Sequence, residues 1–484
     1  MEPVVKTESG RVQGQWEEES AVFLGIPYAE APVGPHRLGP PAPRRAWDGV
    51  RPALHYGPTA PQPAVDFTII PEPVIAGEDC LSLNIFTPDP SPTAALPVMV
   101  WIHGGGFVTG CSASPWYRGT RFARDGVVVV SINYRLGAEG FLRVEGAPDN
   151  RGALDWAAAL EWVQANIAGF GGDASRVTVA GQSAGAVACL GLMAMPGAAG
   201  LFGGVIAMSG AALFNGAQHD ATSQAEAVAG QLGCRPTRED LGRFSPEELV
   251  AAQAGAGAGG LGALGLFIDG EVLPSDPVAA IAQGTGGSLP LLLGTTQDEA
   301  VPAIIGSADR IDPERFARRM GRLGLSETQA GAYRQLMPEG PLWRVLARAS
   351  GDRMFRLPAA RLADVRAVAS GNDGSAGAPG ASTYAYEFRW PSPALGGFGA
   401  CHCLDLPFVF DNLDAHWVET VAGAETPQGL ADNMHAAWVS FVSRGDPGWA
   451  AYNSDRRPVM TFDGQSALVE DPLGLERAIW SSGD

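Results

Sequence analysis

Lysine is almost missing from this chain: Lys6 is the single lysine among 484 residues, so arginine carries nearly all of the positive charge. Lysine and arginine together number 33 against 52 aspartates and glutamates, which leaves a formal net charge of −19. A surface this acidic repels phosphate groups. The composition therefore argues against nucleic acid and anionic membranes as partners, and weakly against polyanionic substrates.

Cysteine and long apolar runs are also scarce. The six cysteines, at positions 80, 111, 189, 234, 401 and 403, form no CxxC pair, and the seven histidines add no HExxH motif or Cys/His cluster. We therefore expect free thiols in a reducing compartment and no bound metal. No apolar run approaches the roughly 18 residues of a membrane span, and residues 1–10 lack the apolar core of a secretory leader. Together these absences predict a cytoplasmic protein that does not enter a membrane.

Runs with strand character alternate with runs of helical character along the chain. Residues 127–133 (VVVVSIN) show no polar alternation, as expected for a strand buried on both faces. Residues 151–168 repeat apolar side chains at helical spacing and end before Gly169. Further strands are expected at 83–87, 96–103, 176–180 and 289–294, a helix at 184–195, and a loop or weak helix in the Gly/Ala-rich segment 251–266. This order predicts an α/β fold, with a parallel sheet and crossover helices.

The strongest chemical signal is the sequence Gly181-Gln182-Ser183-Ala184-Gly185, which fits the pattern G-x-S-x-G. It lies between a predicted buried strand and a predicted helix, the context that this motif requires. A serine in a sharp, strained turn needs small neighbours, and the helix that follows offers backbone donors and a positive dipole end. A chance match is the alternative, but the strand–turn–helix context favours a nucleophilic serine.

Two glycine-rich segments are candidates for binding an anion. The first, residues 103–107 (HGGGF), follows a predicted strand and fits an oxyanion loop of the HGGG type, although a plain glycine turn is the simpler interpretation. The second is a literal G-x-G-x-x-G at Gly260, Gly262 and Gly265. It follows no strand and lies in a Gly/Ala tract, so we interpret it as an accident of composition rather than a dinucleotide site.

A nucleophilic serine needs a base, and His402 stands out among the histidines. A loop of small residues precedes it and the apolar run LPFVF follows shortly after it. His103 is better placed to orient the glycine loop than to titrate. The acid is expected between serine and histidine, in α/β-hydrolase order. Asp298 and Glu299 both follow the strand at 289–294, so the residues alone leave the choice between them open.

With these motifs in place, the chain resembles the type-B carboxylesterase family, which includes bacterial para-nitrobenzyl esterases and the cholinesterases. The similarity extends along nearly the whole length. Besides the glycine loop at 103–107, it is carried by residues 23–29 (FLGIPYA), 78–85 (EDCLSLNI), 149–152 (DNRG), 170–173 (FGGD), 181–185 (GQSAG), 294–299 (GTTQDE), 402–410 (HCLDLPFVF) and 445–447 (GDP).

The resemblance implies a serine carboxylesterase with Ser183 as nucleophile, His402 as base and Glu299, rather than Asp298, as acid. It implies one enlarged α/β-hydrolase domain over residues 1–484, because the triad spans positions 183 to 402 and has to converge. The expected substrate is a small uncharged ester, and no cofactor is needed. The implied oxyanion donors are the amides of Gly105, Gly106 and Ala184, and the implied buried serine that supports the triad is Ser209.

The same resemblance implies an apolar substrate pocket. About half of its expected residues are predicted to be no more than core side chains, since large apolar residues are usually buried for packing alone. The pocket residues implied are Phe107, Leu213, Phe214, Leu266, Phe267, Met354, Phe355 and Phe398.

Two departures from the family bear on compartment and substrate. Secreted members close a disulfide from the cysteine that corresponds to Cys80, but the matching partner position here is Ala60. We therefore expect this loop to be unstapled, as in a cytoplasmic enzyme. Residues 63–79 contain no tryptophan, which choline-ester enzymes use as a platform for the cation. A choline ester is thus a poor expectation.

Two other functions remain open. The chain could be a different acyl hydrolase, such as an amidase or a lipase, because a Ser–His–acid triad does not by itself distinguish ester from amide. It could also be a non-catalytic adhesion or scaffold protein on the same fold. That second alternative predicts the loss of a triad residue, whereas candidates for all three are present.

Overall fold

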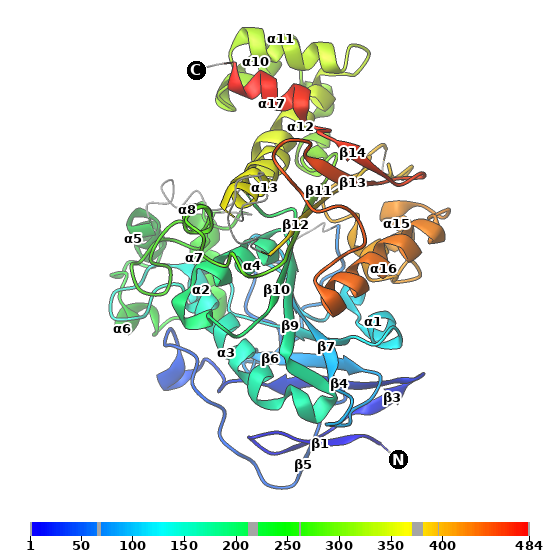
Figure 1. The fold of residues 1–484 in the computed structure, drawn as a ribbon. Coiled ribbons are helices and arrows are strands. Elements are labelled where there is room, and N and C mark those ends of the chain that lie inside the picture. The colour runs from blue at the N-terminus through cyan, green and yellow to red at the C-terminus, as the bar shows by residue number, and fades with distance from the viewer. Residues whose placement is uncertain are drawn as a thin grey trace.

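A large twisted sheet runs through the molecule and separates two layers of helices (Figure 1). The computed structural model describes residues 2–64, 69–211, 221–260, 263–369, 381–394 and 396–482. Within these residues the sheet has 11 strands in the order β14-β13-β12-β11-β10-β9-β7-β8-β6-β4-β3, and a 3-stranded sheet, β1-β2-β5, lies near the N-terminus. The strands are β1 Val4–Lys6, β2 Arg11–Gln13, β3 Gln15–Glu17, β4 Ser20–Pro27, β5 Val50–Pro52, β6 Ser82–Thr87, β7 Leu96–Ile102, β8 Val128–Ile132, β9 Gly172–Gln182, β10 Gly204–Met208, β11 Leu291–Thr296, β12 Thr383–Phe388, β13 Pro458–Phe462 and β14 Ala467–Glu470.

The strands from β8 to β13 pair in parallel, and the antiparallel pairs lie toward the two edges. The expected α/β fold with a mostly parallel sheet is therefore confirmed. The α-helices of the described chain are α1 Thr120–Arg124, α2 Gly137–Phe141, α3 Arg151–Asn166, α4 Ala184–Ala194, α5 Ala221–Gln231, α6 Arg238–Leu241, α7 Pro246–Gly255, α8 Pro277–Ala282, α9 Val301–Ile305, α10 Pro313–Arg322, α11 Glu327–Leu336, α12 Leu342–Gly351, α13 Leu357–Ala369, α14 Leu406–Val409, α15 Val418–Ala422, α16 Gln428–Arg444 and α17 Gly474–Ser481.

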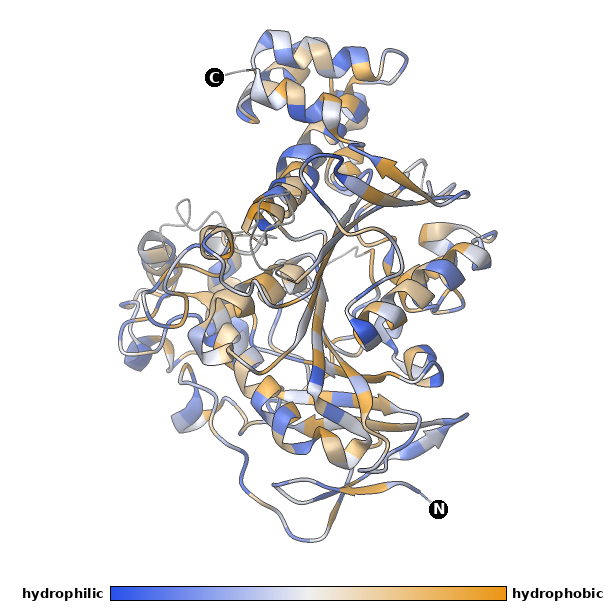
Figure 2. Ribbon diagram, viewed as in Figure 1, coloured by the Kyte–Doolittle hydropathy of each residue, from blue (hydrophilic) through white to orange (hydrophobic). Residues whose placement is uncertain are grey.

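Side chains of the central strands alternate between two hydrophobic cores. In β7, Val98 and Val100 join the core that contains α3 and α4, whereas Met99 and Trp101 join the core that contains α1 and α16. This period of two follows from the pleat of a strand, and burial on both faces explains why β7 is apolar along its whole length. In Figure 2 hydrophobic residues recur along the strands of the sheet, with polar residues between them in places. Beyond one end of the sheet, α10, α11 and α17 form a small upper lobe that α12 joins to the body (Figure 1).

The expected elements match the observed ones closely. The helix predicted at 151–168 is α3 followed by a 3₁₀ turn, Ile167–Phe170, and the strand predicted at 176–180 is the longer β9. The Gly/Ala-rich segment 251–266 divides. Its first residues complete α7, whose Ser245 capping box starts the helix, and the described residues after Gly255 form no regular element. No helix among the described residues has both the length and the apolar character needed to cross a membrane.

A buried ion pair joins the end of β8 to α3. Arg135 follows β8, and its guanidinium binds both carboxylate oxygens of Asp155 on α3, with Nε–Oδ2 at 2.8 Å and Nη2–Oδ1 at 2.6 Å. Both side chains are at most 1% exposed. Breaking such a pair leaves an uncompensated charge in a region of low dielectric constant, which is far more costly than removing both partners.

We expect Asp155→Asn to lower the free energy of unfolding by about 3–5 kcal/mol, because Arg135 then remains charged and buried. The double substitution Arg135→Met with Asp155→Leu should lose less than the single one, since no isolated charge remains. Urea denaturation followed by circular dichroism measures both. A double variant less stable than Asp155→Asn would contradict this account.

Candidate active site

Ser183 occupies the turn between β9 and α4, with φ 57° and ψ −123°. This conformation is strained for a residue with a side chain, and such strain persists only where the surroundings enforce it. The surroundings are very close here: a Cβ on Gly185 would lie 2.0 Å from the carbonyl oxygen of Ile102, and one on Gly181 would lie 2.4 Å from the backbone of Gly185. Only glycine fits at both places, which explains the two glycines of the motif.

The glycine loop after β7 lies beside this turn, since a Cβ on Gly104 would be 3.2 Å from the Cβ of Ser183. Gly105 and Gly106 have φ values of 101° and 61°. Among the described residues, the N–H groups of Gly105, Gly106 and Ala184 donate to no protein acceptor. Free backbone donors next to a serine are what an oxyanion hole requires.

His103 supports this loop from below. Its ring stacks on Tyr134 with centroids 4.5 Å apart, and its Nδ1 lies 2.8 Å from the carbonyl oxygen of Gly104. Burial lowers the pKa of His103 to about 4, so the ring is neutral at physiological pH. This position agrees with the expectation that His103 orients the loop.

His402 and Glu299 meet although 103 positions separate them in the chain. His402 Nδ1 lies 2.5 Å from Glu299 Oε2, and Glu299 Oε1 accepts a hydrogen bond from the amide of Thr296 at 2.8 Å. The Glu299 side chain is fully buried. A carboxylate can only accept, so Nδ1 carries the proton and Nε2 is left as the basic nitrogen.

Asp298 has a different role from its neighbour. Its backbone N–H donates to the carbonyl oxygen of Ala400 at 2.8 Å, and its Oδ2 accepts from the amide of Ala400 at 3.0 Å. These bonds tie the loop that carries His402 to the turn that carries Glu299. The structure therefore places Glu299 against the imidazole and Asp298 against the backbone.

Gln182 was not singled out in the sequence, although it is the first variable residue of the G-x-S-x-G motif. Its Nε2 lies 3.1 Å from His402 Nε2, and its buried Oε1 has no hydrogen-bond partner among the described residues. In this resting arrangement the basic nitrogen of His402 therefore contacts Gln182, and the hydroxyl of Ser183 makes no hydrogen bond within the described chain.

Electrostatics around His402 favour its charged form. Burial opposes a charge on the ring, but the contacts with Cys403 and Glu299 outweigh burial and hold the pKa of His402 well above its ordinary value. Burial also raises the pKa of the Cys403 thiol, which is therefore uncharged at neutral pH. The carboxylate of Glu299 is then the charge that stabilises an imidazolium.

A second buried carboxyl group lies close to the triad candidates, and the sequence motifs did not indicate it. Asp405 is inaccessible to solvent; its Oδ2 accepts from the hydroxyl of Tyr386 at 2.9 Å, and its Oδ1 has no partner among the described residues. Burial raises the pKa of Asp405 to about 7, and the charge of Glu299 adds to this effect. An acidic residue three positions after His402, at the start of an apolar run, is the sequence signal that could have indicated it.

Ser209 lies beneath the serine turn. Its amide donates to the carbonyl oxygen of Gly294 at 2.7 Å, and a Cβ on the next residue, Gly210, would be 2.6 Å from the carbonyl oxygen of Ser183. The hydroxyl of Ser209 is buried and has no partner within the described chain. Ser209 therefore lies next to the serine turn and, among the described residues, makes no side-chain hydrogen bond to a triad residue.

The expected pocket residues occupy different environments. The ring of Phe355 lies 4.9 Å from that of His402, whereas Phe107 packs 4.6 Å from Phe141 in an aromatic cluster of the core. Met354 is 42% exposed. The other described ones, Leu266, Phe267 and Phe398, are buried, and Leu213 and Phe214 lie outside the described residues.

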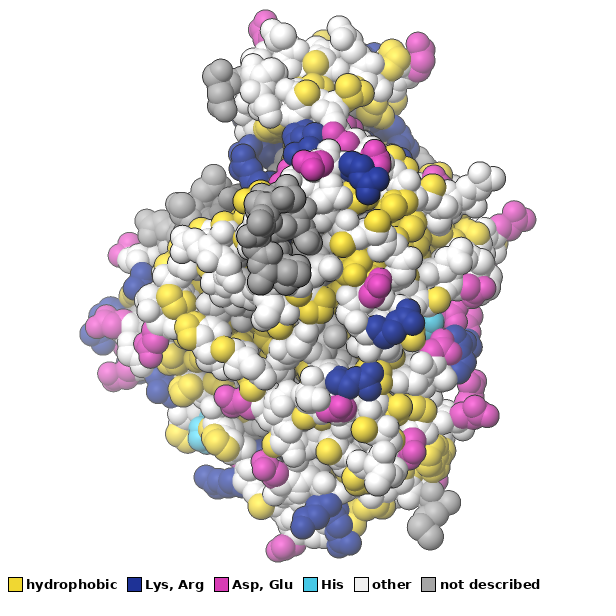
Figure 3. Space-filling view, viewed as in Figure 1, with side chains coloured by type: hydrophobic (Ala, Val, Ile, Leu, Met, Phe, Trp, Pro, Cys, Tyr) yellow, Lys and Arg dark blue, Asp and Glu magenta, His cyan; other side chains and the backbone are white. Residues whose placement is uncertain are grey.

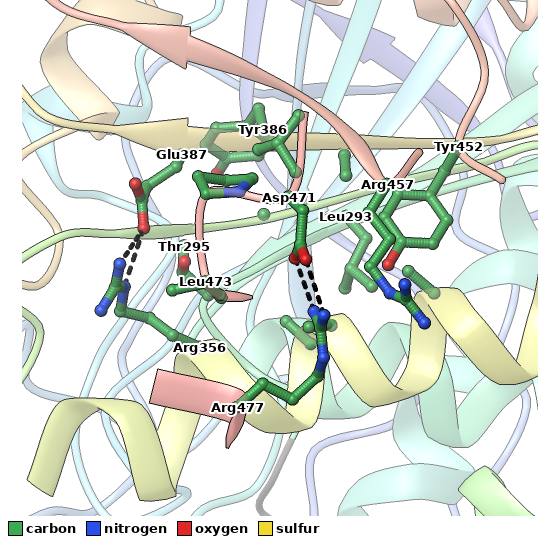
Figure 4. Close-up of a pocket in the computed structure, with 17 residues that line it drawn as sticks. Leu293, Thr295, Arg356, Tyr386, Glu387, Tyr452, Arg457, Asp471, Leu473 and Arg477 are labelled. Carbon is green, nitrogen blue, oxygen red and sulfur yellow. Dashed lines mark hydrogen bonds and ion pairs between the residues drawn. The ribbon is translucent and has the colours of Figure 1, made fainter. Parts of the chain in front are cut away.

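A separate small cavity of about 40 Å³ lies between α13, the strands β11 to β13 and the C-terminal segment (Figure 4). Two ion pairs occupy its walls, Arg356 with Glu387 and Arg477 with Asp471. None of the triad candidates lines it. Across the described chain, no group of three or more His, Cys, Asp or Glu side chains could hold a metal ion.

The fold and this site define a serine hydrolase of the α/β type. Comparison with known proteins agrees, because a model of the carboxylesterase family matches residues 1–477. The chain is 36% identical to para-nitrobenzyl esterase of Bacillus subtilis, with 98% of this chain and 97% of the relative covered, and 34% identical to phenmedipham hydrolase of Pseudarthrobacter oxydans, with 97% of each covered. The crystal structure of carboxylesterase EST55 of Geobacillus stearothermophilus matches with a TM-score of 0.86 at 36% identity, over 99% of both chains.

The chain therefore belongs to the carboxylesterase family and is a carboxylic-ester hydrolase with the α/β-hydrolase fold. The resemblance inferred from the sequence motifs is confirmed.

The contacts of the two neighbouring acids predict opposite outcomes on substitution. We expect Glu299→Gln to lower kcat by roughly 10³–10⁴-fold, because the amide no longer holds the imidazole in its active tautomer. Asp298→Asn keeps an oxygen that can accept from Ala400, so its loss should stay below about tenfold, in line with a net hydrogen-bond contribution near 1 kcal/mol. Steady-state kinetics on a p-nitrophenyl ester compares the two, with circular dichroism as the check on folding. The reverse order of losses would assign the acid to Asp298.

The raised pKa of His402 predicts the acid limb of the pH profile. Activity should fall as the pH drops through this pKa, because an imidazolium cannot accept the serine proton, and the fall should begin above the ordinary histidine range. Glu299→Gln removes the charge that favours the imidazolium, so its limb should move to lower pH. Plots of kcat/KM against pH measure both limbs, with Asp298→Asn as the control. Coincident limbs for the native enzyme and Glu299→Gln would contradict this electrostatic account.

Proposed function

We propose that the chain hydrolyses small uncharged esters through an acyl-enzyme, with Ser183 as nucleophile, His402 as base and Glu299 as acid. The observation that carries the proposal is the 2.5 Å contact between His402 Nδ1 and Glu299 Oε2, beside a serine in a strained turn. A base oriented by a buried acid next to a nucleophile in a strained turn is the arrangement of nucleophilic acyl transfer.

The first half of the cycle forms the acyl-enzyme. When the substrate enters, the side chain of Gln182 moves away from the Nε2 atom of His402. This nitrogen then takes the proton of Ser183 as the hydroxyl oxygen attacks the ester carbonyl. The charge that develops on the carbonyl oxygen is held by the amides of Gly105, Gly106 and Ala184. Loss of one such donor costs roughly 3–4 kcal/mol of transition-state stabilisation in comparable hydrolases.

The second half releases the acid. His402 gives its proton to the leaving alkoxide, the C–O bond breaks and the alcohol departs. Water then attacks the acyl-enzyme carbonyl, His402 takes a proton from the water, and this proton returns to Ser183 as the acid leaves. Glu299 stabilises the imidazolium in both halves without becoming protonated.

The preference for uncharged substrates is supported by the aromatic ring of Phe355 against His402 and by the net charge of −19, which disfavours polyanions. We further propose a cytoplasmic location. It is supported by the six cysteines, which are all free, including the buried Cys80, and by Ala60 at the position where secreted relatives would pair it.

A panel of p-nitrophenyl esters of increasing acyl length, measured beside a p-nitroanilide, tests this function. We expect hydrolysis of short and medium esters and covalent labelling of Ser183 by an organophosphate, with both lost in Ser183→Ala. Faster turnover of the anilide than of every ester would favour an amidase instead. Absence of both ester hydrolysis and labelling in the native protein would falsify the proposed mechanism.

A further inference from the structure

Five arginines surround a depression on the upper lobe, far from the serine turn in the fold. The depression has a volume of about 340 Å³ and is lined by Ser307, Arg310, Arg315, Arg318, Arg319 and Arg322. We call it the arginine depression. Volumes of this size are typical of sites for small molecules. It lies along α10, and the short 3₁₀ helix Ala308–Arg310 before α10 supplies its remaining arginine.

The helical repeat brings these side chains to one face. Arg315, Arg318, Arg319 and Arg322 are three or four positions apart, while Phe316 and Met320 on the same helix are buried in the core. The guanidinium of Arg315 donates to the carbonyl oxygen of Arg310 at 3.0 Å, which holds the 3₁₀ helix against α10. The cluster is therefore a property of the fold as well as of the local sequence.

These charges are poorly compensated. Within the described chain, Glu314 pairs with Arg318 at 3.3 Å, and no carboxylate lies within ion-pair distance of the other four arginines. The other acidic residues between positions 307 and 322 are Asp309 and Asp312. The side chain of Asp312 caps α10 by accepting a hydrogen bond from the amide of Arg315 at 2.7 Å. Like charges three or four positions apart on a helix repel one another and oppose helix formation.

The rest of the protein makes this concentration unusual. Acidic residues exceed basic ones by 19 over the whole chain, yet residues 307–322 hold five arginines and three acids. On the face shown in Figure 3, basic and acidic side chains are interspersed. A local pattern that opposes the composition of the chain and places like charges three or four positions apart on one helix favours a functional site over a chance arrangement.

We propose that the arginine depression binds a phosphate group. Guanidinium groups present planar forks of N–H donors that match phosphate oxygens in charge and geometry. The guanidinium groups come from two turns of α10 and from the preceding 3₁₀ helix, so they approach the depression from different directions. A tetrahedral phosphate has oxygens that point in different directions and can meet several of these groups, whereas the two oxygens of a carboxylate lie in one plane. The ligand would be a free phosphorylated small molecule or a phospholipid headgroup. The site is separate from the triad and does not depend on the proposed ester hydrolysis.

Isothermal titration with inorganic pyrophosphate tests the site. We expect saturable binding by the native protein that weakens as sodium chloride is added, because the contacts are ionic. Arg319→Gln with Arg322→Gln should weaken binding at least about tenfold, since two charge-assisted hydrogen-bond donors are removed. Unchanged hydrolysis of a p-nitrophenyl ester shows that this variant is folded.

The matched control is Arg11→Gln with Arg45→Gln, which removes the same charge from two exposed arginines in the N-terminal segment. If both double variants weaken pyrophosphate binding equally, the loss reflects the net charge of the protein rather than a specific site, and the proposal is overturned. The absence of saturable binding by the native protein would overturn it as well. Sedimentation with phosphatidylcholine vesicles, with and without phosphatidylglycerol, distinguishes a phospholipid headgroup from a free phosphorylated small molecule as the ligand. Vesicle binding that pyrophosphate displaces assigns a headgroup, and pyrophosphate binding without vesicle binding assigns a soluble phosphate.

Discussion

The contact between the serine turn and the strand beside it is the constraint on which this site depends. Gly185 approaches the carbonyl oxygen of Ile102 so closely that no side chain fits, and β9 pairs with β7 directly below. This packing forces Ser183 into a conformation it would otherwise avoid, and it presses the helix N-terminus and the glycine loop against the same point. Strain at the nucleophile and the free amides around it therefore share one physical origin: two parallel strands and a helix packed without side chains between them.

Buried charge is the second organising feature. Glu299 is enclosed beside His402, and Asp405 is enclosed nearby, with no lysine or arginine of the described residues within ion-pair distance of it. Two carboxyl groups in one apolar region cannot both ionise easily, which agrees with the raised pKa of Asp405. A proton on Asp405 leaves Glu299 as the dominant negative charge at the imidazole. The chemistry thus depends on burial as much as on the three residues of the triad.

Much of the fold and of the candidate site could be read from the sequence, for identifiable reasons. The central strands are buried on both faces, so their apolar runs are continuous, and the glycines of the serine turn are required by local sterics. By contrast, the choice between Asp298 and Glu299 could not be made from residue types, because adjacent acids after a strand have the same local pattern. Their roles differ only because the loop that carries His402 contacts Asp298 through its backbone and contacts Glu299 through the imidazole ring.

The alternation of strands and helices, the strained serine turn, the glycine loop and the family could all be predicted from the amino-acid sequence. Each of these depends on short-range sterics or on the period of a buried element, which the chain carries locally. Residue types alone left the acid open, the resemblance implied Glu299, and the structure shows Glu299 in contact with His402. The contact of Gln182 with the basic nitrogen and the burial of Asp405 near the triad came from the tertiary structure alone. It also decided that five arginines face one depression. Those facts depend on distances between segments far apart in the chain, and such distances are set by packing rather than by local pattern.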